Sequence, residues 1–563
     1  MRREVSVVNK KVCSFPILFA LLALLIGTCA VVFPASAQAA PTSTGSITVS
    51  GNVARSYDAY QIFSANVGDG DGDAKIATDL AWASDAVRDA ALPVLHSAGM
   101  PNSQTTAQEA AEWLNTDSHL TSALSAQLAR SLQSSGAVSV ALNAGTTAEL
   151  PCGYWLIVAD DDVIAQGEAG TAPIMALVGG SAVTVKPKAA TPKVSKHVLE
   201  DSTAAWQKAA DATVADDLYW RLSATVPAGL TAYDTYTVQF VDTMSAGLDP
   251  SKVVASMRVY AAAGADGGFD AVSAGRDGRA GTEPAKGWTD ITAQCATMVA
   301  ADGKTFTVRT GDLIAALGGA DAFAAGARVV AVYNAPLNSA CNHGIAKGNP
   351  NEVYLRYPRS PFADQSGDAG FTHTPSDDAC AYTWDLALTK RGSDGDKPLA
   401  GAVLSIADDR GRTLAADGTW DAEDKATVTT GEDGRVTVSG VDSGKLEVRE
   451  LKAPKGYTAF EGTRSVMVKA EGLDVDQVAA AKPKLTITAE LPLRADSADG
   501  STGSLEASLI NTPTGTPPSI TTGGFMPSTG DMAMYAAAAA AVAGAALIVV
   551  ALLVKRGGGS HKE

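Results

Sequence analysis

The sequence predicts a mainly β protein in which several β-sandwiches follow one another along the chain. Between the two ends, the chain is rich in Thr, Val, Ala, Gly and Asp, and its apolar residues come in short alternating runs, the pattern of half-buried strands. One section also shows helical periodicity, so we expect helices added to its sandwich. An uncharged apolar run at 532–554 is about long enough to cross a bilayer as a single C-terminal transmembrane helix.

Both ends of the chain are targeting segments rather than parts of the folded body. Basic residues precede an apolar stretch at 15–33, and small-x-small cleavage sites follow at 35–39. This order is typical of a secretory signal peptide, so we exclude 1–40 from the fold. At the other end, Lys555 and Arg556 follow the apolar run and would hold that end on the cytoplasmic side.

Composition narrows the function classes. The formal net charge is −17 although both ends are basic, which argues against nucleic acid or anionic lipid as a partner. The sequence contains no Cys-x-x-Cys, His-Glu-x-x-His, Gly-x-Ser-x-Gly or Walker-type motif. We therefore predict no metal site, no cofactor and no enzymatic turnover of an external substrate.

Four cysteines remain once the signal peptide is removed, and they are Cys152, Cys295, Cys341 and Cys380. An even number of cysteines in an oxidising compartment permits two disulfides. Four cysteines can pair in three ways, and the sequence does not choose among them.

The exported body, roughly 490 residues, is long enough for about three domains. The first section, 41–187, has strand patterns at 46–49, 60–63, 137–142 and 154–158. Between them, Thr106-x-x-Glu109 forms a capping box. Leucines then recur at every fourth position from Leu120 to Leu132. This section therefore combines a β-sandwich with helices.

The second section spans 188–383 and the third spans 384–513. Strand-like runs of the second section lie at 218–226, 236–241, 328–333 and 352–357. Those of the third section lie at 384–388, 402–406, 435–438 and 445–448. A Thr/Pro/Gly-rich stretch at 514–525 reads as a spacer, and 526–563 contains the terminal motif and the transmembrane run.

A short motif precedes the C-terminal apolar run: Met526-Pro527-Ser528-Thr529-Gly530. It resembles the Leu-Pro-x-Thr-Gly sorting signal that sortases cut between Thr and Gly. The resemblance implies that the carboxyl of Thr529 is transferred to an amine. It also implies a secreted chain that ends up attached to peptidoglycan on the cell surface. Met526 replaces the usual Leu with an apolar residue of similar volume.

The third section carries a twelve-residue box at 446–457, Leu-Glu-Val-Arg-Glu-Leu-Lys-Ala-Pro-Lys-Gly-Tyr. It resembles the Tyr-x-Leu-x-Glu-x-x-Ala-Pro-x-Gly-Tyr box of CnaB-type domains in Gram-positive surface proteins. The resemblance implies an isopeptide bond between Lys390 and Asn511, promoted by Glu450. The chemistry suits these residue types, because burial favours the neutral amine and a protonated carboxyl can polarise the Asn carbonyl and shuttle protons.

The second section contains a looser set of the same residue types: Lys196, Asp242 and Asn351. Period-two alternation puts Asn351 on one face with Val353, and we expect this face to point inward. This layout resembles the middle domain of fimbrial backbone pilins, which implies a second Lys–Asn bond promoted by Asp242. Asn349 is a competing acceptor, and Lys193 is a weaker competing donor.

At the junction of the first two sections the chain reads Val183-Thr184-Val185-Lys186-Pro187-Lys188. It resembles the pilin motif of sortase-assembled pili, an apolar strand followed by Tyr-Pro-Lys, with Lys186 in the place of Tyr. The resemblance implies that Lys188 is the amine joined to the next subunit, and Lys186 is the alternative.

As a whole, the chain is similar to the sortase-assembled backbone pilins of Gram-positive bacteria. The resemblance implies tandem immunoglobulin-like (Cna-type) sandwiches in a structural shaft subunit that supports adhesion. Its implied partners are pilus-specific and housekeeping sortases, other copies of the chain, peptidoglycan, accessory pilins and a host ligand. The alternative is a wall-anchored adhesin displayed as a monomer. Between Pro41 and Val185 the only lysine is Lys75, so we expect no cross-link in the first section.

Overall fold

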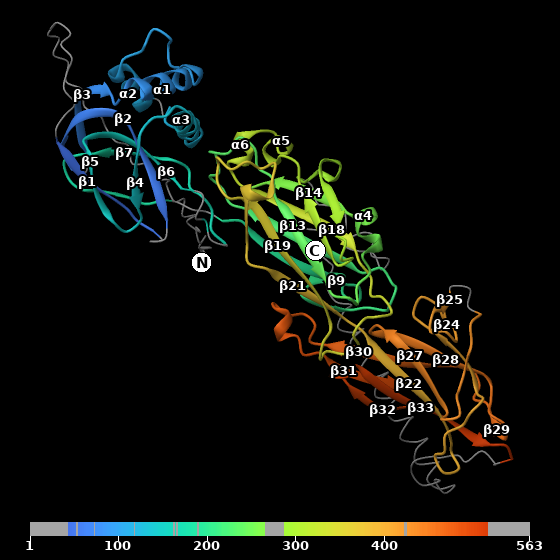
Figure 1. Cartoon of the computed structure of the whole chain (residues 1–563). Helices are drawn as coiled ribbons and strands as arrows, with labels where there is room; N and C mark the ends of the chain where they lie inside the picture. The colour runs from blue at the N-terminus through green and yellow to red at the C-terminus, as the bar shows by residue number, and fades with distance from the viewer. Residues whose placement is uncertain are drawn as a thin grey trace, which may run out of the picture.

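The computed structural model describes residues 43–51, 55–72, 74–116, 119–160, 164, 167–187, 191–264, 287–421 and 425–515. The sheets form three bodies that follow one another along an elongated molecule (Figure 1). We call them the first (43–187), middle (191–382) and third (384–515) body. The signal peptide, Lys188, the sorting motif and the C-terminal apolar run lie outside the described residues. Among the helices that are described, none is long and apolar enough to span a membrane.

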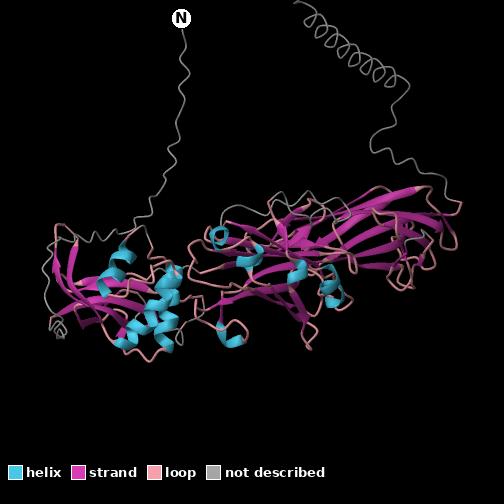
Figure 2. Ribbon diagram, turned by 90° about the horizontal axis from the view of Figure 1, so that it is seen from above, coloured by secondary structure: helices cyan, strands magenta, loops and turns pink. Residues whose placement is uncertain are grey.

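The first body contains two sheets and three helices. One sheet has the order β5 (Thr147–Pro151), β1 (Thr44–Val49), β8 (Val183–Val185). The other has the order β3 (Lys75–Trp82), β2 (Ser56–Asp69), β6 (Gly153–Ala159), β7 (Ile174–Val178), with β4 (Ser139–Asn143) also paired to β2. The helices are α1 (Asp85–Ser97), α2 (Ala107–Asn115) and α3 (Ser122–Ser134), and they gather in this body (Figure 2).

The predicted helix signals of the first body are confirmed. The Thr106 hydroxyl accepts a hydrogen bond from the Glu109 N–H at 3.2 Å, and the Glu109 carboxylate accepts one from the Thr106 N–H at 3.0 Å. This reciprocal pair starts α2. Of the leucine series, Leu124, Leu128 and Leu132 are buried on α3. The sequence did not reveal α1, which has a proline at position 93 inside it, a residue that normally ends a helical pattern.

The middle body is a sandwich of two sheets. The first sheet has the order β10 (Ala205–Gln207), β9 (Lys193–Glu200), β12 (Tyr219–Val226), β18 (Ala327–Asn334), β14 (Arg258–Ala263), β15 (Thr289–Asp290). The second has the order β11 (Ala209–Asp211), β21 (Asp377–Tyr382), β19 (Asn349–Pro358), β13 (Gln239–Met244), β17 (Thr305–Arg309), β16 (Ala296–Val299), with β20 (Phe371–His373) paired to β19. Short helices α4 (Val253–Ser256), α5 (Leu313–Ala316) and α6 (Ala320–Phe323) cap the ends. Trp220, Phe240 and Phe306 lie in the core between the sheets.

The third body is a second sandwich. One sheet has the order β27 (Arg435–Val441), β22 (Trp384–Gly392), β33 (Ser504–Pro513), β29 (Tyr457–Thr458), with β32 (Leu493–Asp499) also paired to β33. The other has the order β25 (Trp420–Asp421), β24 (Thr413–Leu414), β23 (Val403–Ala407), β28 (Gly444–Lys452), β30 (Thr463–Glu471), β31 (Lys484–Ala489), with β26 (Val428–Thr429) paired to β23. The first and last strands, β22 and β33, are parallel neighbours.

The middle and third bodies meet at a tight joint. Only Thr383 separates β21 from β22, and this residue is fully buried. On either side of it, the rings of Tyr382 and Trp384 stack with centroids 6.2 Å apart and an interplanar angle of 8°. Gly344 donates its N–H to the Thr383 carbonyl at 3.0 Å. A Cβ on Gly344 would lie 2.5 Å from the backbone N of Gly503, so this approach requires glycine.

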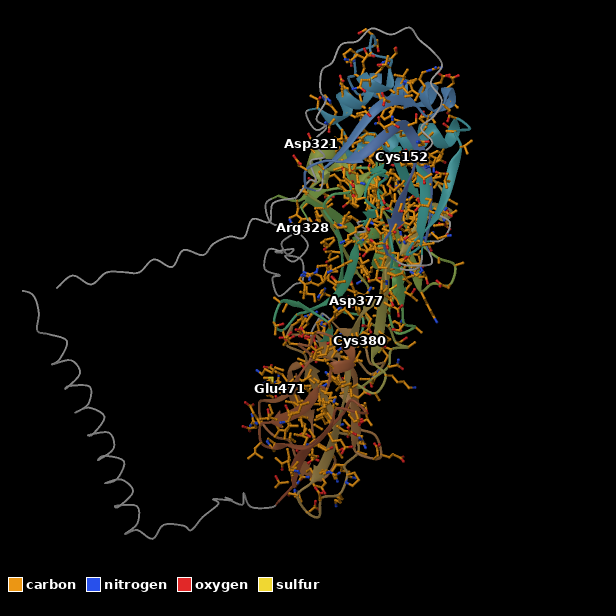
Figure 3. The ribbon with its side chains drawn as sticks, turned by 90° about the vertical axis from the view of Figure 1, so that its left-hand side faces the viewer. Cys152, Asp321, Arg328, Asp377, Cys380 and Glu471 are labelled. Atoms are coloured by element: carbon orange, nitrogen blue, oxygen red, sulfur yellow. The ribbon has the colours of Figure 1, made fainter. Side chains whose placement is uncertain are left out.

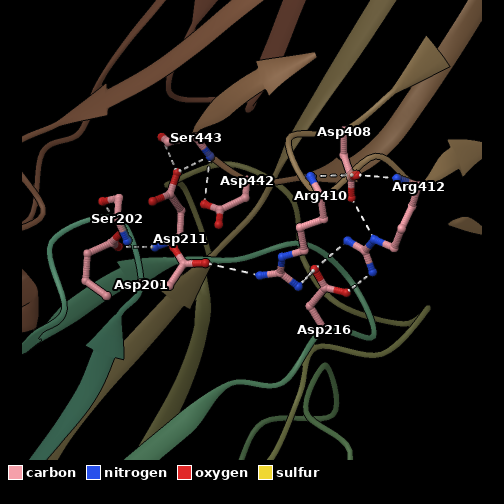
Figure 4. A network of polar contacts seen from close by, with 10 residues as sticks. Asp201, Ser202, Asp211, Asp216, Asp408, Arg410, Arg412, Asp442 and Ser443 are labelled. Carbon is pink, nitrogen blue, oxygen red and sulfur yellow. Dashed lines mark hydrogen bonds and ion pairs between the residues drawn. The ribbon is translucent and has the colours of Figure 1, made fainter. Parts of the chain in front are cut away.

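Polar side chains of the two bodies form hydrogen bonds and ion pairs beside this joint (Figure 4). The Trp384 indole donates to the Asp211 carboxylate at 2.6 Å, and the Ser443 N–H donates to the same oxygen at 3.0 Å. Arg410 pairs with Asp216 at 2.8 Å and with Asp201 at 3.3 Å. The two bodies are therefore held by directional contacts as well as by packing.

Carboxyl groups crowd the buried side of the joint. Burial, with a further contribution from the charge of Asp211, raises the pKa of Glu200 to about 8. The same causes raise the pKa of Asp442 well above its ordinary value. Desolvation raises the pKa of Asp201 as well, although Arg410 opposes the shift and the side chain is 41 % exposed. The contact between the two bodies is therefore most stable when some of these carboxyls are protonated.

We expect the joint to lose stability as the pH rises. A carboxyl whose pKa is raised on folding to about 8, from 4.5, stabilises the folded state below pH 4.5 and loses that contribution as the pH approaches 8. Glu200→Gln should flatten the decline in the free energy of unfolding between pH 5 and pH 8, by on the order of a few kcal/mol. Chemical denaturation of both proteins at several pH values measures this, and parallel pH profiles would contradict it.

Candidate functional site: two buried lysine–carboxyl–asparagine clusters

In the third body, one polar cluster lies where the apolar stripes of three strands end. Along β22 the inward residues are Trp384, Leu386, Leu388 and then Lys390. Along β33 the inward stripe ends at Asn511, and along β28 it ends at Glu450. Alternation with a period of two thus carries each polar side chain inward after its apolar neighbours. All three side chains are buried, with exposed fractions of 1 %, 2 % and 6 % for Lys390, Asn511 and Glu450.

The three side chains contact one another directly. The Lys390 Nζ donates to Asn511 Oδ1 and lies 3.0 Å from Glu450 Oε1. The Asn511 Nδ2 donates to the same Glu450 oxygen at 2.9 Å. One carboxylate oxygen therefore bridges the amine and the amide nitrogen. The ring of Phe460 covers the amine, with its centroid 5.6 Å from Nζ, and the Phe460 N–H donates to Glu450 Oε2 at 3.1 Å.

In the middle body, the second cluster lies between the two sheets. Lys196 on β9 and Tyr333 on β18 come from one sheet, whereas Asp242 on β13 and Asn351 on β19 come from the other. The pairing of β13 with β19 sets Asp242 opposite Val353 and Met244 opposite Asn351. Asp242 and Asn351 are therefore diagonal neighbours on the inward face. The predicted inward orientation of Asn351 is confirmed by its complete burial.

The contacts of the second cluster pass through a tyrosine. Lys196 Nζ contacts Asp242 Oδ2 and donates to the Tyr333 hydroxyl at 3.0 Å. The Tyr333 hydroxyl donates to Asp242 Oδ2 at 3.0 Å and accepts from Asn351 Nδ2 at 2.8 Å. The Trp220 and Tyr333 ring centroids each lie 5.5 Å from Lys196 Nζ. Sequence reasoning missed Tyr333, because it lies within an ordinary strand pattern and no motif marks it.

Burial shifts the ionisation of both lysines towards the neutral amine. It lowers the pKa of Lys196 to about 8, against the opposing attraction of Asp242. It lowers the pKa of Lys390 to about 8 as well, against Glu450. Burial also raises the pKa of Asp242 although Lys196 opposes the shift. Both changes favour a neutral amine beside a protonated carboxyl in the middle body, which is the reactive combination.

The two competing residues of the middle body, Lys193 and Asn349, are not part of the Lys196 cluster. Lys193 is exposed on β9. Asn349 is buried, but its Oδ1 accepts from the Asn342 N–H at 2.8 Å and its Nδ2 donates to the Asn342 carbonyl at 2.9 Å. In contrast, Asn351 Oδ1 and Asp242 Oδ1 are buried and have no hydrogen-bond partner among the described residues. The geometry therefore favours Asn351 over Asn349 as the partner of Lys196.

The lysines of the first body and of the junction differ from this pattern. Lys75 is buried at the start of β3, and its Nζ contacts the carbonyls of Gly179 and Ser181 and lies 3.9 Å from Asp69. No asparagine is among the contacts of that amine in the described structure. Lys186 is exposed just after β8, and Lys188 falls outside the described residues.

The two disulfides that the sequence permits are not formed, because Cys152, Cys295, Cys341 and Cys380 are all free thiols. Cys152 lies in the first body and Cys380 lies near the joint (Figure 3). Their separation explains part of the result, because Cys152 belongs to a different body from the other three. Those three make other contacts: Cys295 Sγ lies 3.3 Å from the Ile291 carbonyl, Cys380 Sγ lies 3.7 Å from the Ala381 carbonyl, and Cys341 Sγ lies 3.6 Å from His343 Nε2.

The lowered pKa of Lys390 predicts a pH effect on a chain in which Asn511 is absent. In Asn511→Ala, Lys390 keeps a free amine whose pKa is about 8 when folded and 10.5 in the unfolded chain. The folded state loses its proton first, so the free energy of unfolding should rise between pH 8 and pH 10, by on the order of 1–3 kcal/mol. Denaturation of Asn511→Ala and of the double variant Lys390→Met/Asn511→Ala tests this, since the second should lack the rise.

Comparison with known proteins places the third body in a described domain family. Residues 385–482 match the family model of the SpaA prealbumin-like fold domain, a segment that includes Lys390 and Glu450 but ends before Asn511. Over 134 residues the chain is 31% identical to the "Trypsin-resistant surface T6 protein" of Streptococcus pyogenes serotype M6. The match covers 22% of this chain and 23% of that relative.

Two solved structures are similar over most of the chain. The T6 backbone pilin of serotype M6 Streptococcus pyogenes has a TM-score of 0.46 at 16% identity, covering 85% of this chain and 100% of that one. The major pilin SpaD of Corynebacterium diphtheriae has a TM-score of 0.40 at 14% identity, covering 84% and 98%. The residues that match the family model, 385–482, all lie in the third body.

Proposed function

We propose that this chain is the structural shaft subunit of a pilus that is covalently polymerised and finally anchored to the cell wall. It would act as a sortase substrate rather than as an enzyme. Its partners would be pilus-specific and housekeeping sortases, further copies of itself and peptidoglycan. The proposed domains are 41–187, 188–383 and 384–513, between a signal peptide at 1–40 and a spacer at 514–525 with the sorting signal at 526–563.

One observation carries the proposal: two consecutive bodies each bury a lysine, a carboxyl group and an asparagine in one polar cluster. A buried ion pair alone contributes little to stability, because desolvation offsets the attraction. Two such clusters at the ends of apolar stripes are better explained by reaction than by pairing. Intramolecular Lys390–Asn511 and Lys196–Asn351 isopeptide bonds would suit a subunit that has to resist tension.

In the cluster of the third body, Glu450 contacts both of the nitrogens that exchange in such a reaction. A neutral Lys390 amine would attack the Asn511 side-chain carbonyl carbon, while the protonated Glu450 donates to the carbonyl oxygen. The bond from Nζ to the carbonyl carbon forms, and the bond from that carbon to Nδ2 breaks. One proton moves from Nζ to Nδ2 through Glu450, which contacts both nitrogens. Ammonia leaves, and Glu450 ends in its starting state.

Polymerisation would join Thr529 of one subunit to Lys188 of the next. This linkage is head-to-tail and does not close on itself, so it produces an open fibre. The strand before Lys188 is well held, which supports its use as an attachment point. β8 pairs in parallel with β1, and the Ser50 N–H donates to the Val185 carbonyl at 2.8 Å.

The isopeptide bonds predict a mass defect. The recombinant mature chain should be lighter than its sequence mass by two molecules of ammonia under reducing conditions, because each Lys–Asn bond releases one. Asn351→Ala and Asn511→Ala should each restore one ammonia, and Asn349→Ala is the matched control that should restore none. Intact-protein mass spectrometry makes the measurement, and a wild-type mass equal to the sequence mass would exclude both bonds.

Polymerisation predicts a ladder of SDS-resistant species in cell-wall extracts. Lys188→Ala should abolish the ladder and leave single wall-attached subunits, because the acceptor amine is gone. Lys186→Ala is the control at the neighbouring lysine and should keep it. Loss of the ladder in Lys186→Ala alone would transfer the role to Lys186. A ladder that persists in both variants, or a single band from the wild type, would instead favour a monomeric wall-anchored adhesin.

A further inference from the structure

We propose that Tyr333 is a catalytic residue of the middle body, carrying a proton from the attacking nitrogen of Lys196 to the leaving nitrogen of Asn351. This inference rests on the proposed isopeptide chemistry and adds a component to it. In the middle body, Asp242 and Tyr333 would share the proton transfers that Glu450 performs alone in the third body.

The two clusters of the same chain differ in what bridges their nitrogens. In the third body, one oxygen of Glu450 lies 3.0 Å from Lys390 Nζ and 2.9 Å from Asn511 Nδ2. In the middle body, the Tyr333 hydroxyl occupies the equivalent position, 3.0 Å from Lys196 Nζ and 2.8 Å from Asn351 Nδ2. Asp242 contacts Lys196 and Tyr333 through Oδ2. A phenol hydroxyl both accepts and donates, so it can pass on a proton.

The surroundings leave few other groups to do this. Lys196, Asp242, Asn351 and Tyr333 are all fully buried. Phe306 packs edge-on against the Tyr333 ring with centroids 4.8 Å apart, and Trp220 lies beside the amine. These apolar neighbours exclude water from the cluster and hold the phenol in position. A proton that leaves Lys196 must therefore pass through Asp242 or Tyr333, and Tyr333 is the one that contacts Asn351 Nδ2.

The step can be written so that its atoms balance. The neutral Lys196 amine attacks the Asn351 carbonyl carbon while protonated Asp242 donates to the carbonyl oxygen. In the amide, the Asn351 nitrogen donates a hydrogen bond to the Tyr333 hydroxyl and its lone pair is delocalised. Once the carbon is tetrahedral, this nitrogen becomes a basic amine that can accept a proton. One proton then passes from Nζ to the Tyr333 oxygen as the phenol proton passes to Nδ2. The bond from carbon to Nδ2 breaks, ammonia leaves, the carbonyl oxygen returns its proton to Asp242, and Tyr333 is unchanged.

The test follows bond formation in time by intact mass after cell-free synthesis of the mature chain. Tyr333→Phe keeps the ring and removes only the hydroxyl. Formation of the middle bond should slow by about 10²- to 10⁴-fold, the usual contribution of a positioned acid–base group. The bond of the third body should form at the wild-type rate in the same molecules, which provides an internal control. Peptide mapping assigns each lost ammonia to its lysine.

Matched variants separate the hydroxyl of Tyr333 from a general effect on the fold. Tyr357→Phe removes another buried phenol of the middle body, which donates to the Glu168 carbonyl at 2.8 Å, and it should leave both rates unchanged. Asn351→Ala gives the melting temperature of folded protein without the middle bond, and Tyr333→Phe should melt near it. Tyr333→His returns a group that can take and give a proton, so the middle bond should form faster than in Tyr333→Phe.

The outcomes separate this inference from the proposed function. A wild-type chain that loses no ammonia overturns the proposed function and the relay together. A wild-type chain that loses two, with Tyr333→Phe forming the middle bond at the wild-type rate, overturns the relay alone. A Tyr333→His chain no faster than Tyr333→Phe also counts against proton transfer at this position.

Discussion

The burial of an amine within an apolar core is the constraint on which both sandwiches depend. Lys196 and Lys390 have exposed fractions of 0 % and 1 %, and an isolated ammonium at such a depth is strongly destabilising. Each core therefore includes a carboxyl directly beside the amine. The amide contacts the amine itself in the third body and reaches it through Tyr333 in the middle body. The apolar stripes of the strands bring these groups together. The proposed bond formation would depend on the same packing that forms the cores.

The two clusters connect different parts of their sandwiches. Lys390 and Asn511 lie on β22 and β33, which are neighbouring parallel strands of one sheet. Lys196 and Asn351 lie on strands of opposite sheets. A bond in the third body would therefore lock the first strand to the last strand within a layer. A bond in the middle body would tie one layer to the other, so shear between layers and separation of strands would each meet a covalent restraint.

Much of this arrangement could be predicted from the sequence, because strand alternation and local motifs are short-range signals. The capping box at Thr106 and the inward position of Asn351 follow from such patterns. The gathering of Lys390, Glu450 and Asn511 was expected from the resemblance of the 446–457 box to CnaB-type domains, because Lys390 and Asn511 are 121 positions apart. The contacts of Tyr333 could not be predicted, because they depend on how the two sheets face each other. The possibility of disulfides was inferred from the oxidising compartment alone. It is not realised for Cys152 and Cys380, which lie in different bodies. The sequence also did not reveal the carboxyl-rich joint, since Asp442 lies on a different body from Glu200 and Asp211.

The single-residue link at Thr383 has a consequence for bending. A rod made of subunits bends most easily at the points where two neighbouring segments can tilt without breaking many contacts. Between the middle and third bodies, any tilt would pull Trp384 from Asp211 and separate Arg410 from Asp216. These two bodies should therefore behave as one stiff segment. In a filament of such chains, the persistence length would be set by other connections, between the first and middle bodies and between successive subunits.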